Sequence, residues 1–179
     1  MPRYLATIYD EWLVLRCQDS ETEAYEILVG RWQDRLWRYA WSLTKCREAA
    51  SDVTQESWLA VVRGIGRLDD PAGFGPWVHR IVRNKCADWV RSRQKQRNAE
   101  QTLRVQAKPD KNEPVDGGIN DELMQALKEL SSDHSAVLVL HYLNGLSVAE
   151  IAHLLDTPEG TVKSRLHHAR NLMKKILER

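Results

Sequence analysis

The chain has 179 residues, of which 42% are hydrophobic, and its 26 basic and 25 acidic residues leave a net charge of +1. This apolar content excludes wholesale disorder, and the length suffices for one ordinary domain or two small ones. No segment approaches the roughly 20 apolar residues that span a bilayer, and Asp10 and Glu11 precede any long apolar run. We therefore expect no membrane insertion, no signal peptide and a cytoplasmic location.

Three cysteines, Cys17, Cys46 and Cys86, are scattered along the chain without a Cys-x-x-Cys pair. An odd and dispersed set is typical of a reducing compartment, so we expect buried thiols rather than a disulfide framework. The same pattern disfavours a zinc site, and we expect no cofactor.

The first long helix is predicted between residue 20 and about residue 44, after a short mixed segment at residues 8–16 that could form one or two helical turns. Ser20 and Glu23 have the spacing of a capping box, which would open this helix. Its apolar residues recur at steps of three or four and predict a buried stripe: Ala24, Leu28, Trp32, Leu36, Tyr39 and Leu43, with Trp37 and Trp41 beside it.

A second helix is predicted at residues 47–68, with Val53, Leu59, Val62 and Ile65 facing inward. Its polar face carries Asp52, Gln55 and Glu56, and Trp58 flanks them. Such a face is either simply solvated or, because exposed aromatic residues beside acids often contact proteins, a partner surface.

Residues 69–76 are rich in glycine and proline and predict a break before a long helix at residues 74–97. One side of that helix is predicted to be buried: Phe74, Trp77, Val78, Ile81, Val82, Trp89 and Val90. The other side collects Arg80, Arg83, Asn84, Ala87 and Arg91. Arginines for phosphates, an amide for base edges and an aromatic residue in the loop suit nucleic-acid binding, although an ordinary arginine-rich exterior fits equally well.

Apolar periodicity is lost at residues 98–118, where Gln, Lys, Asn, Pro and Gly dominate. This length is typical of a linker, so we predict one domain at residues 1–97 and another at residues 119–179. The second domain begins with a helix through Leu123, Leu127 and Leu130. Ser131 to Asp133 would cap the next helix, and Asn144-Gly145 would end it.

Residues 146–170 predict two helices joined by a tight turn. Ser147 and Glu150 form a second capping-box pattern, and Thr157-Pro158 restarts the helix as an N-cap followed by proline. On a wheel of about 100° per residue, the second helix has one apolar and one basic side. The apolar side carries Val162, Leu166, Ala169, Met173 and Ile176, and the basic side carries Lys163, Ser164, His167, His168, Asn171, Lys174 and Lys175. This arrangement favours a helix-turn-helix that enters a major groove over a solvated helix of a bundle. No strand-like alternation occurs, so the fold class is all-α.

Three segments resemble extracytoplasmic-function (ECF) sigma factors. LSVAEIAHLLDTPEGTVKSRL (146–166) resembles their region-four helix-turn-helix, DVTQESWL (52–59) their region two, and WVHRIVRNKCADWVR (77–91) the helix that follows. The order, the spacing and the intervening linker also agree, over nearly all of residues 20–175. The resemblance implies a subunit without catalysis of its own that gives core RNA polymerase its promoter specificity and is held inactive by an anti-sigma factor.

The resemblance also implies roles for particular residues. Core polymerase would be bound by Asp52, Gln55, Glu56 and Trp58. The promoter element nearest the start site, including a flipped base of the melted strand, would be bound by residues 69–76 and by Arg80, Arg83, Asn84, Lys85, Asp88 and Arg91. The upstream promoter element would be bound by Thr161, Lys163, Ser164, Arg165, His167 and His168, where Arg165 could instead make an internal contact.

Two features depart from the family pattern. Ser131 stands where the family usually has proline, and His167 and His168 stand where larger apolar residues or arginine are common. Imidazole can donate or accept a hydrogen bond, so promoter sequence preference cannot be carried over from relatives.

Three alternatives remain open on the sequence. One is a DNA-binding regulator that acts without polymerase, and another is an interaction scaffold with aromatic helices. The third is a metal hydrolase using His134, His141, His153, His167 and His168, but these histidines lack a His-Glu-x-x-His or comparable ligand spacing.

Overall fold

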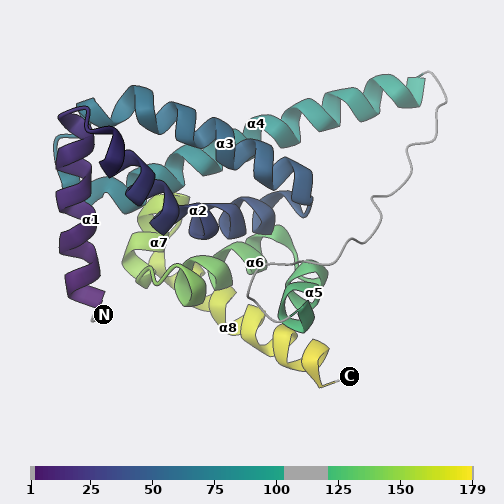
Figure 1. Cartoon of the computed structure of the whole chain (residues 1–179). Helices are drawn as coiled ribbons and strands as arrows, with labels where there is room; N and C mark the ends of the chain where they lie inside the picture. The colour runs from purple at the N-terminus through teal and green to yellow at the C-terminus, as the bar shows by residue number, and fades with distance from the viewer. Residues whose placement is uncertain (1–2, 103–120, 179) are drawn as a thin grey trace.

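The computed structural model describes residues 3–102 and 121–178, and all regular elements in these ranges are helical (Figure 1). The predicted linker at residues 98–118 lies largely outside them. The N-terminal half contains α1 (Arg3–Gln18), α2 (Thr22–Thr44), α3 (Arg47–Gly64) and α4 (Phe74–Thr102). Two short 3-10 turns, η1 (Ile65–Arg67) and η2 (Pro71–Gly73), connect α3 to α4.

The C-terminal half contains α5 (Asp121–Glu129), α6 (Ser132–Leu138), α7 (Val148–Leu155) and α8 (Glu159–Leu177). A single π-helical turn, η3 (Val139–Leu143), continues α6. Gly145 has a φ of 74°, which ends this segment at the predicted position. The all-α prediction is confirmed, and none of the described helices is both long and apolar enough to cross a membrane.

The N-terminus of the chain differs from the prediction in two respects. Residues 8–16 belong to the full helix α1, because Leu13, Val14 and Cys17 form a buried face against the rest of the core. The capping box predicted at Ser20 is wrong. Ser20 takes a left-handed conformation with a φ of 67°, and Glu21 is the N-cap of α2 without a side-chain cap. The Glu21 carboxylate instead accepts a hydrogen bond of 2.7 Å from Arg16 Nε.

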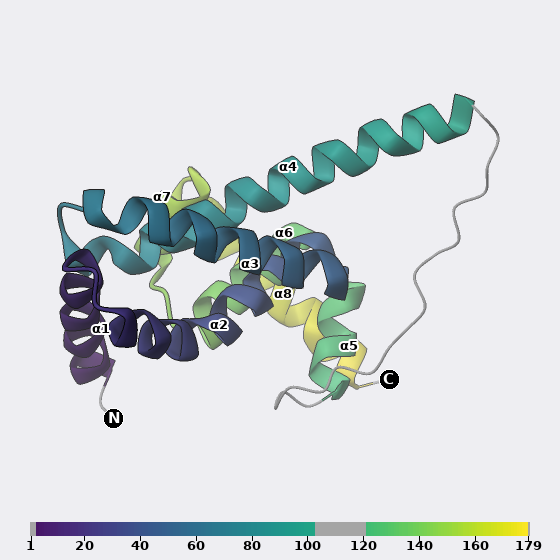
Figure 2. The same cartoon turned by 45° about the horizontal axis from the view of Figure 1, so that its top comes forward.

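The two halves pack against each other around one apolar core. Leu36 and Tyr39 of α2 and Val82 of α4 belong to the same buried cluster as Leu140 of η3 and Ile151 of α7. Figure 1 shows α6 and α8 below α2 and α3, and in both Figure 1 and Figure 2 the far end of α4 extends beyond the other helices. The structure thus brings the two predicted domains into direct contact.

Side-chain burial corrects the predicted inner faces of α3 and α4. Val53 and Ile65 are buried as expected, but Leu59 and Val62 are 53% and 55% exposed. Leu59 and Val62 lie outside the buried face of α3, which is formed by Ala49, Ala50, Val53, Thr54, Ser57, Trp58 and Val61. On α4, Phe74, Val78 and Val82 are buried, whereas Trp77, Ile81 and Trp89 are half-buried and Val90 is exposed.

Candidate nucleic-acid and protein interfaces

Helices α7 and α8 form the predicted helix-turn-helix. The Ser147–Glu150 capping box is confirmed: Glu150 Oε2 accepts from Ser147 N at 2.6 Å, and Ser147 Oγ accepts from Glu150 N at 3.2 Å. Asp156 makes the turn with a φ of 52°. The N-cap predicted at Thr157 is wrong, because α8 starts one residue later with Pro158 as its N-cap, and the Thr157 hydroxyl donates to Leu155 O.

The two faces of α8 separate as predicted. Val162, Leu166 and Ala169 are buried against the other helices, and Met173 and Ile176 are half-buried. The opposite side is exposed over its whole length, and it carries Thr161, Lys163, Ser164, His167 and His168. This leaves a polar and basic helical surface of the kind that major-groove recognition requires.

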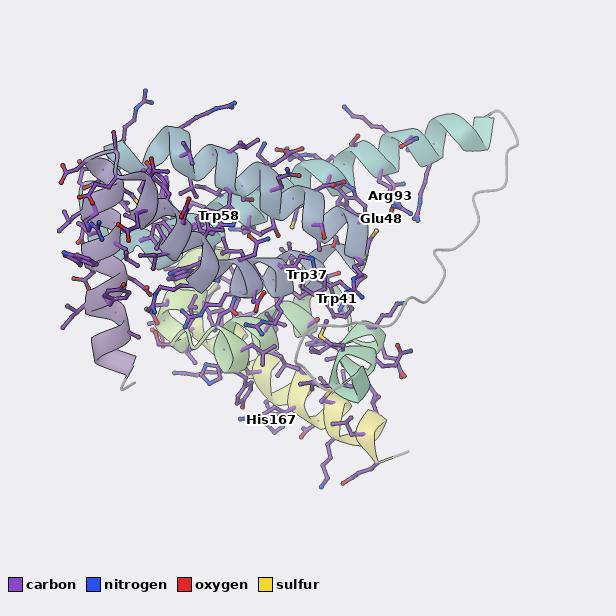
Figure 3. The ribbon with its side chains drawn as sticks, in the orientation of Figure 1. Trp37, Trp41, Glu48, Trp58, Arg93 and His167 are labelled. Carbon is purple, nitrogen blue, oxygen red and sulfur yellow. The ribbon has the colours of Figure 1, made fainter. Side chains whose placement is uncertain are left out.

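Two residues of α8 make contacts that could not be predicted from the sequence. Arg165 is half-buried and forms an ion pair of 2.8 Å with Asp133 of α6, so it makes the internal contact rather than lying free on the basic face. The His167 ring lies on the outer surface (Figure 3), where its Nε2 is 3.0 Å from Asn171 Nδ2.

The basic face of α4 is largely engaged by other parts of the chain. Arg83 Nη1 donates to Leu154 O at 2.7 Å, and Arg80 Nη2 lies 3.1 Å from His153 Nε2, both on α7. Lys85 forms an ion pair of 2.9 Å with Glu56 of α3. Asp88 and Arg91 pair with each other, and Asn84 is exposed. The predicted residues therefore share one face, on which Arg83 is half-buried by its contact with α7 while Arg80 stays exposed beside His153.

His79 is a residue that the sequence analysis missed. It is fully buried, its ring lies 5.4 Å from that of Tyr39 and 5.9 Å from that of Trp32, and this burial lowers its pKa to about 4. His79 Nδ1 donates to Gly75 O at 2.7 Å, because a carbonyl can only accept. The other ring nitrogen, Nε2, then accepts from Asn144 Nδ2 at 2.9 Å. The only available signal was its position beside Val78 and Val82 on the inner face of α4.

A surface on α3 carries the acidic residues of the predicted protein interface. Asp52, Gln55 and Glu56 are exposed, and Leu59 and Val62 extend the same side of the helix. We call these five residues the α3 stripe. An exposed aliphatic pair next to acids is typical of a protein contact surface. Leu59 and Val62 were missed because their spacing also fits an inward-facing pattern.

The prediction that Trp58 is exposed beside these acids is wrong. The Trp58 ring is buried between α2 and α3 (Figure 3), and its Nε1 donates to Gln33 Oε1 at 2.6 Å. An indole N–H needs an acceptor when it is buried, and Gln33 of α2 supplies one. Trp58 therefore supports the position of α3 from inside the fold.

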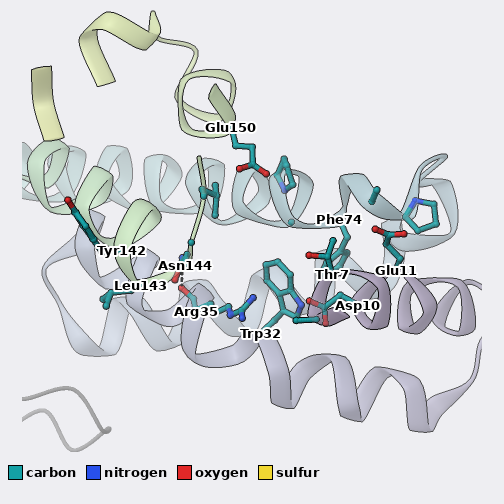
Figure 4. Close-up of a pocket in the computed structure, with 17 residues that line it drawn as sticks. Thr7, Asp10, Glu11, Trp32, Arg35, Phe74, Tyr142, Leu143, Asn144 and Glu150 are labelled. Atoms are coloured by element: carbon teal, nitrogen blue, oxygen red, sulfur yellow. Dashed lines mark hydrogen bonds between the residues drawn. The ribbon is translucent and has the colours of Figure 1, made fainter. Parts of the chain in front are cut away.

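A cavity of about 260 Å³ lies where α1, α2 and the start of α4 meet the turn at Asn144. Figure 4 shows Trp32 and Arg35 on one side of it, with Asn144 and Glu150 coming from the C-terminal half. Trp32 Nε1 and Asn144 Oδ1, two buried atoms of this lining, have no hydrogen-bond partner. The two halves thus border a groove that is partly open to solvent at this point.

In the described part of the chain, no three His, Cys, Asp or Glu side chains are grouped so as to hold a metal ion. Cys17 and Cys86 are buried free thiols, as predicted, and burial raises their pKa values to about 11 and about 12. Cys46 is half-buried and also free.

Comparison with known proteins agrees with this arrangement. Residues 28–96 match the family described as Sigma-70 region 2, and residues 120–173 match Sigma-70, region 4. The ECF RNA polymerase sigma factor SigM of Mycobacterium tuberculosis is 32% identical over 154 residues, which are 86% of this chain and 77% of SigM. The chain belongs to the ECF RNA polymerase sigma factor family.

Other family members are similar over different lengths. SigE of Mycolicibacterium smegmatis is 33% identical over 159 residues, but these cover 86% of this chain and only 62% of SigE. The solved structure of the sigma factor RpoE in complex with the anti-sigma factor NepR, from Bartonella quintana, has a TM-score of 0.70 at 21% identity. That match covers 88% of this chain and 98% of RpoE, and it shows that the two chains share a fold.

Proposed function

We propose that this ECF family member binds core RNA polymerase, recognises promoter DNA through two separate helical surfaces and directs transcription initiation. The observation that carries the proposal is the combination of the α3 stripe with two basic helices, α4 and α8, in segments that match sigma regions two and four. The proposal assigns no catalytic step to this chain and requires no cofactor.

The proposed contact with polymerase is the α3 stripe. Its acids, Asp52 and Glu56, would supply charge complementarity, and Leu59 and Val62 would supply the apolar area that an interface core needs. Trp58, which is buried, would hold α3 in position.

The proposed contact with the start-proximal element combines residues 69–76 with the basic face of α4: Arg80, Arg83, Asn84, Lys85, Asp88 and Arg91. Its arginines and lysine would bind phosphates, and Asn84 is free to contact a base. Asp88 would act indirectly, since it pairs with Arg91. Binding of bases that are unpaired only in the open complex would shift the equilibrium toward melted DNA.

The proposed contact with the upstream element is the exposed face of α8. Thr161, Lys163, Ser164, His167 and His168 would enter the major groove, where Lys163 can also contact phosphates. We propose that Arg165 contributes by fixing α8 against α6 through Asp133.

An anti-sigma factor is the proposed inhibitor, because a fold relative, RpoE, is solved in complex with one. The cytoplasm, where RNA polymerase acts, is the proposed location.

The test is transcription by core RNA polymerase on a library of promoter fragments with and without this protein. New and specific start sites are expected with the wild-type chain. The double variant Asp52→Lys with Glu56→Lys should lose both the start sites and the complex with core enzyme, because two favourable charges become repulsive. Glu26→Lys, which reverses an exposed acid on α2 outside the α3 stripe, is the matched control.

The possible failures differ in meaning. A stable complex with core enzyme that starts no transcription would favour a regulator, and the absence of any complex would contradict the proposal.

A further inference from the structure

Helix α1 has two apolar sides. One side is buried in the core and was described above. On the opposite side, Ile8, Trp12 and Leu15 are 44%, 45% and 50% exposed. Their spacing of four and then three residues aligns them in one row along the helix. We call these three residues the α1 stripe. Single exposed apolar residues are common on protein surfaces, but a row of three that includes a tryptophan is typical of a contact surface.

The helix that carries this stripe is fixed to the rest of the fold. Asp10, near its middle, is buried and forms an ion pair of 2.6 Å with Arg31 of α2. In its last turn, Gln18 Nε2 donates to Ile65 O at 3.0 Å and to Leu68 O at 2.8 Å. The α1 stripe is therefore presented on a positioned helix, so a partner would not have to order this backbone on binding.

The side chain at the centre of the stripe is also held in place. The ring of Tyr9 stacks on that of Trp12 with centroids 5.5 Å apart, and the Arg16 guanidinium lies 4.6 Å from the Trp12 ring. Arg16 in turn donates to the Glu21 carboxylate at 2.7 Å. A tryptophan that is already ordered loses little side-chain entropy on binding, which suits it to anchor an interface.

The surroundings of the α1 stripe are acidic. Glu11 lies on α1 itself, Asp19 and Glu21 lie in the turn that follows, and Glu23 lies in the first turn of α2. The neighbouring base, Arg16, already pairs with Glu21 and Glu23. This charge repels polyanions such as DNA and favours a partner that presents basic groups beside apolar ones.

The α3 stripe combines acids with exposed aliphatic residues in the same way, and the two stripes approach each other. The last turn of α1 meets the connection that follows α3 through the bonds of Gln18 (Figure 1). Leu15 and Val62 each lie three residues before this contact along their helices. Two exposed arginines, Arg63 and Arg67, lie at this join, so the acidic surroundings belong to α1 and to the turn after it.

From these observations we infer that the α1 stripe is a second contact surface for core RNA polymerase, with Trp12 as its anchor. A single partner with basic and apolar groups fits both stripes, and α1 extends the contact beyond α3. This inference rests on the proposed function, because it takes the α3 stripe as the polymerase surface.

The first measurement is the affinity of the full-length protein for immobilised core RNA polymerase by biolayer interferometry. Trp12→Ala should weaken binding about tenfold or more, mainly through faster dissociation, because it removes the anchor. Val90→Ala is the matched control, since Val90 is 48% exposed on α4 and lies outside both stripes. It should bind as the wild type does.

A second pair of variants keeps the test valid if Trp12→Ala disturbs α1, which circular dichroism would reveal. Leu15→Lys and Leu15→Glu both replace a half-exposed leucine by a charged residue, so they should fold alike. They differ toward the partner. At low salt Leu15→Lys should bind several-fold more weakly than Leu15→Glu, because a basic partner surface repels it, and the difference should shrink as salt is added.

Two results would overturn the inference. One is wild-type affinity in the α1 variants while Asp52→Lys with Glu56→Lys fails to bind, which would leave the proposed function standing. The other is equal affinity of Leu15→Lys and Leu15→Glu at low salt, which would contradict a basic partner surface at α1. A wild-type chain that does not bind core enzyme at all would contradict both the inference and the proposed function.

Discussion

Helices α4 and α8 both carry a basic face opposite an apolar one, yet the structure uses the two faces differently. The face of α8 is exposed along its length, with Lys163, Ser164 and His168 in solvent. On α4, Arg80 and Arg83 contact α7 of the other half of the chain. A basic helical face therefore indicates residues that are able to bind DNA, while tertiary packing decides whether those residues are accessible.

The largest expected effect is a loss of stability when a buried residue of α8 is truncated, compared with an exposed residue of the same helix. Leu166→Ala should lower the free energy of unfolding by about 3 kcal/mol, because Leu166 is buried and its loss leaves a cavity. Leu172→Ala, at a 40% exposed position of the same helix, should cost much less. Chemical denaturation followed by circular dichroism measures both, and equal losses would contradict the assignment of the two faces.

The second prediction concerns the buried histidine of α4 against the exposed histidines of α8. Burial lowers the pKa of His79 to about 4, below its ordinary 6.5, so the unfolded chain binds a proton that the folded chain excludes between these values. Stability contributed by neutral His79 is present above pH 6.5 and is lost as the pH falls toward 4. The loss should reach about 2 kcal/mol at pH 5.

Unfolding measured from neutral pH to pH 5 tests this expectation. His79→Gln should flatten the pH dependence, whatever its own stability, whereas His168→Gln at an exposed position should keep it. A His79→Gln profile as steep as that of the wild type would assign the pH dependence to other groups.

The third prediction compares one cation from the basic face of α8 with one from the basic face of α4. Lys163→Ala should reduce the slope of log K against log salt for random duplex DNA by about 1, because Lys163 is exposed and its ion pair with Glu159, at 3.5 Å, is solvated and can give way to a phosphate. Arg83→Ala in an otherwise wild-type chain should change this slope little, since Arg83 already donates to Leu154 O. Fluorescence anisotropy measures both slopes. A larger effect of Arg83→Ala than of Lys163→Ala would contradict the claim that Arg83 is the less accessible of the two cations.

The smallest expected effect is at Arg165, a half-buried basic residue of α8 that pairs with Asp133 of α6. Its ion pair with Asp133 is partly solvated, so Arg165→Ala should cost under about 1 kcal/mol of unfolding free energy. A double-mutant cycle with Asp133→Ala isolates the pair. A coupling energy near zero would show that the contact does not help to fix α8 against α6.

The prediction was most accurate where local rules suffice. Helix α2 ends at Thr44 as expected, Ser147 and Glu150 form their capping box, and Gly145 takes the left-handed conformation that ends η3. These features depend on neighbours within four residues, so the sequence specifies them directly. The same holds for the two faces of α8, whose 3.6-residue period separates Val162 and Leu166 from Lys163 and His167.

The errors arose where more than one arrangement fits the same local pattern. Ser20 and Glu23 have capping-box spacing, but the turn after α1 puts Ser20 in a left-handed conformation. Leu59 and Val62 fit an inward helical face as well as Val53 does, but the packing of α3 on α2 and α4 buries the side of the helix that carries Trp58 and leaves them outside. Trp58 is buried for the same reason.

By itself, the sequence determined the helices, most of their ends and the chemical character of each face, because these follow from hydrogen bonding and periodicity over a few residues. Only the tertiary structure decided that the two halves share one core, that His79 meets Asn144 across it, and that Arg83 donates to Leu154. Such contacts join residues more than 60 positions apart. No local pattern contains them, because they depend on how whole helices pack.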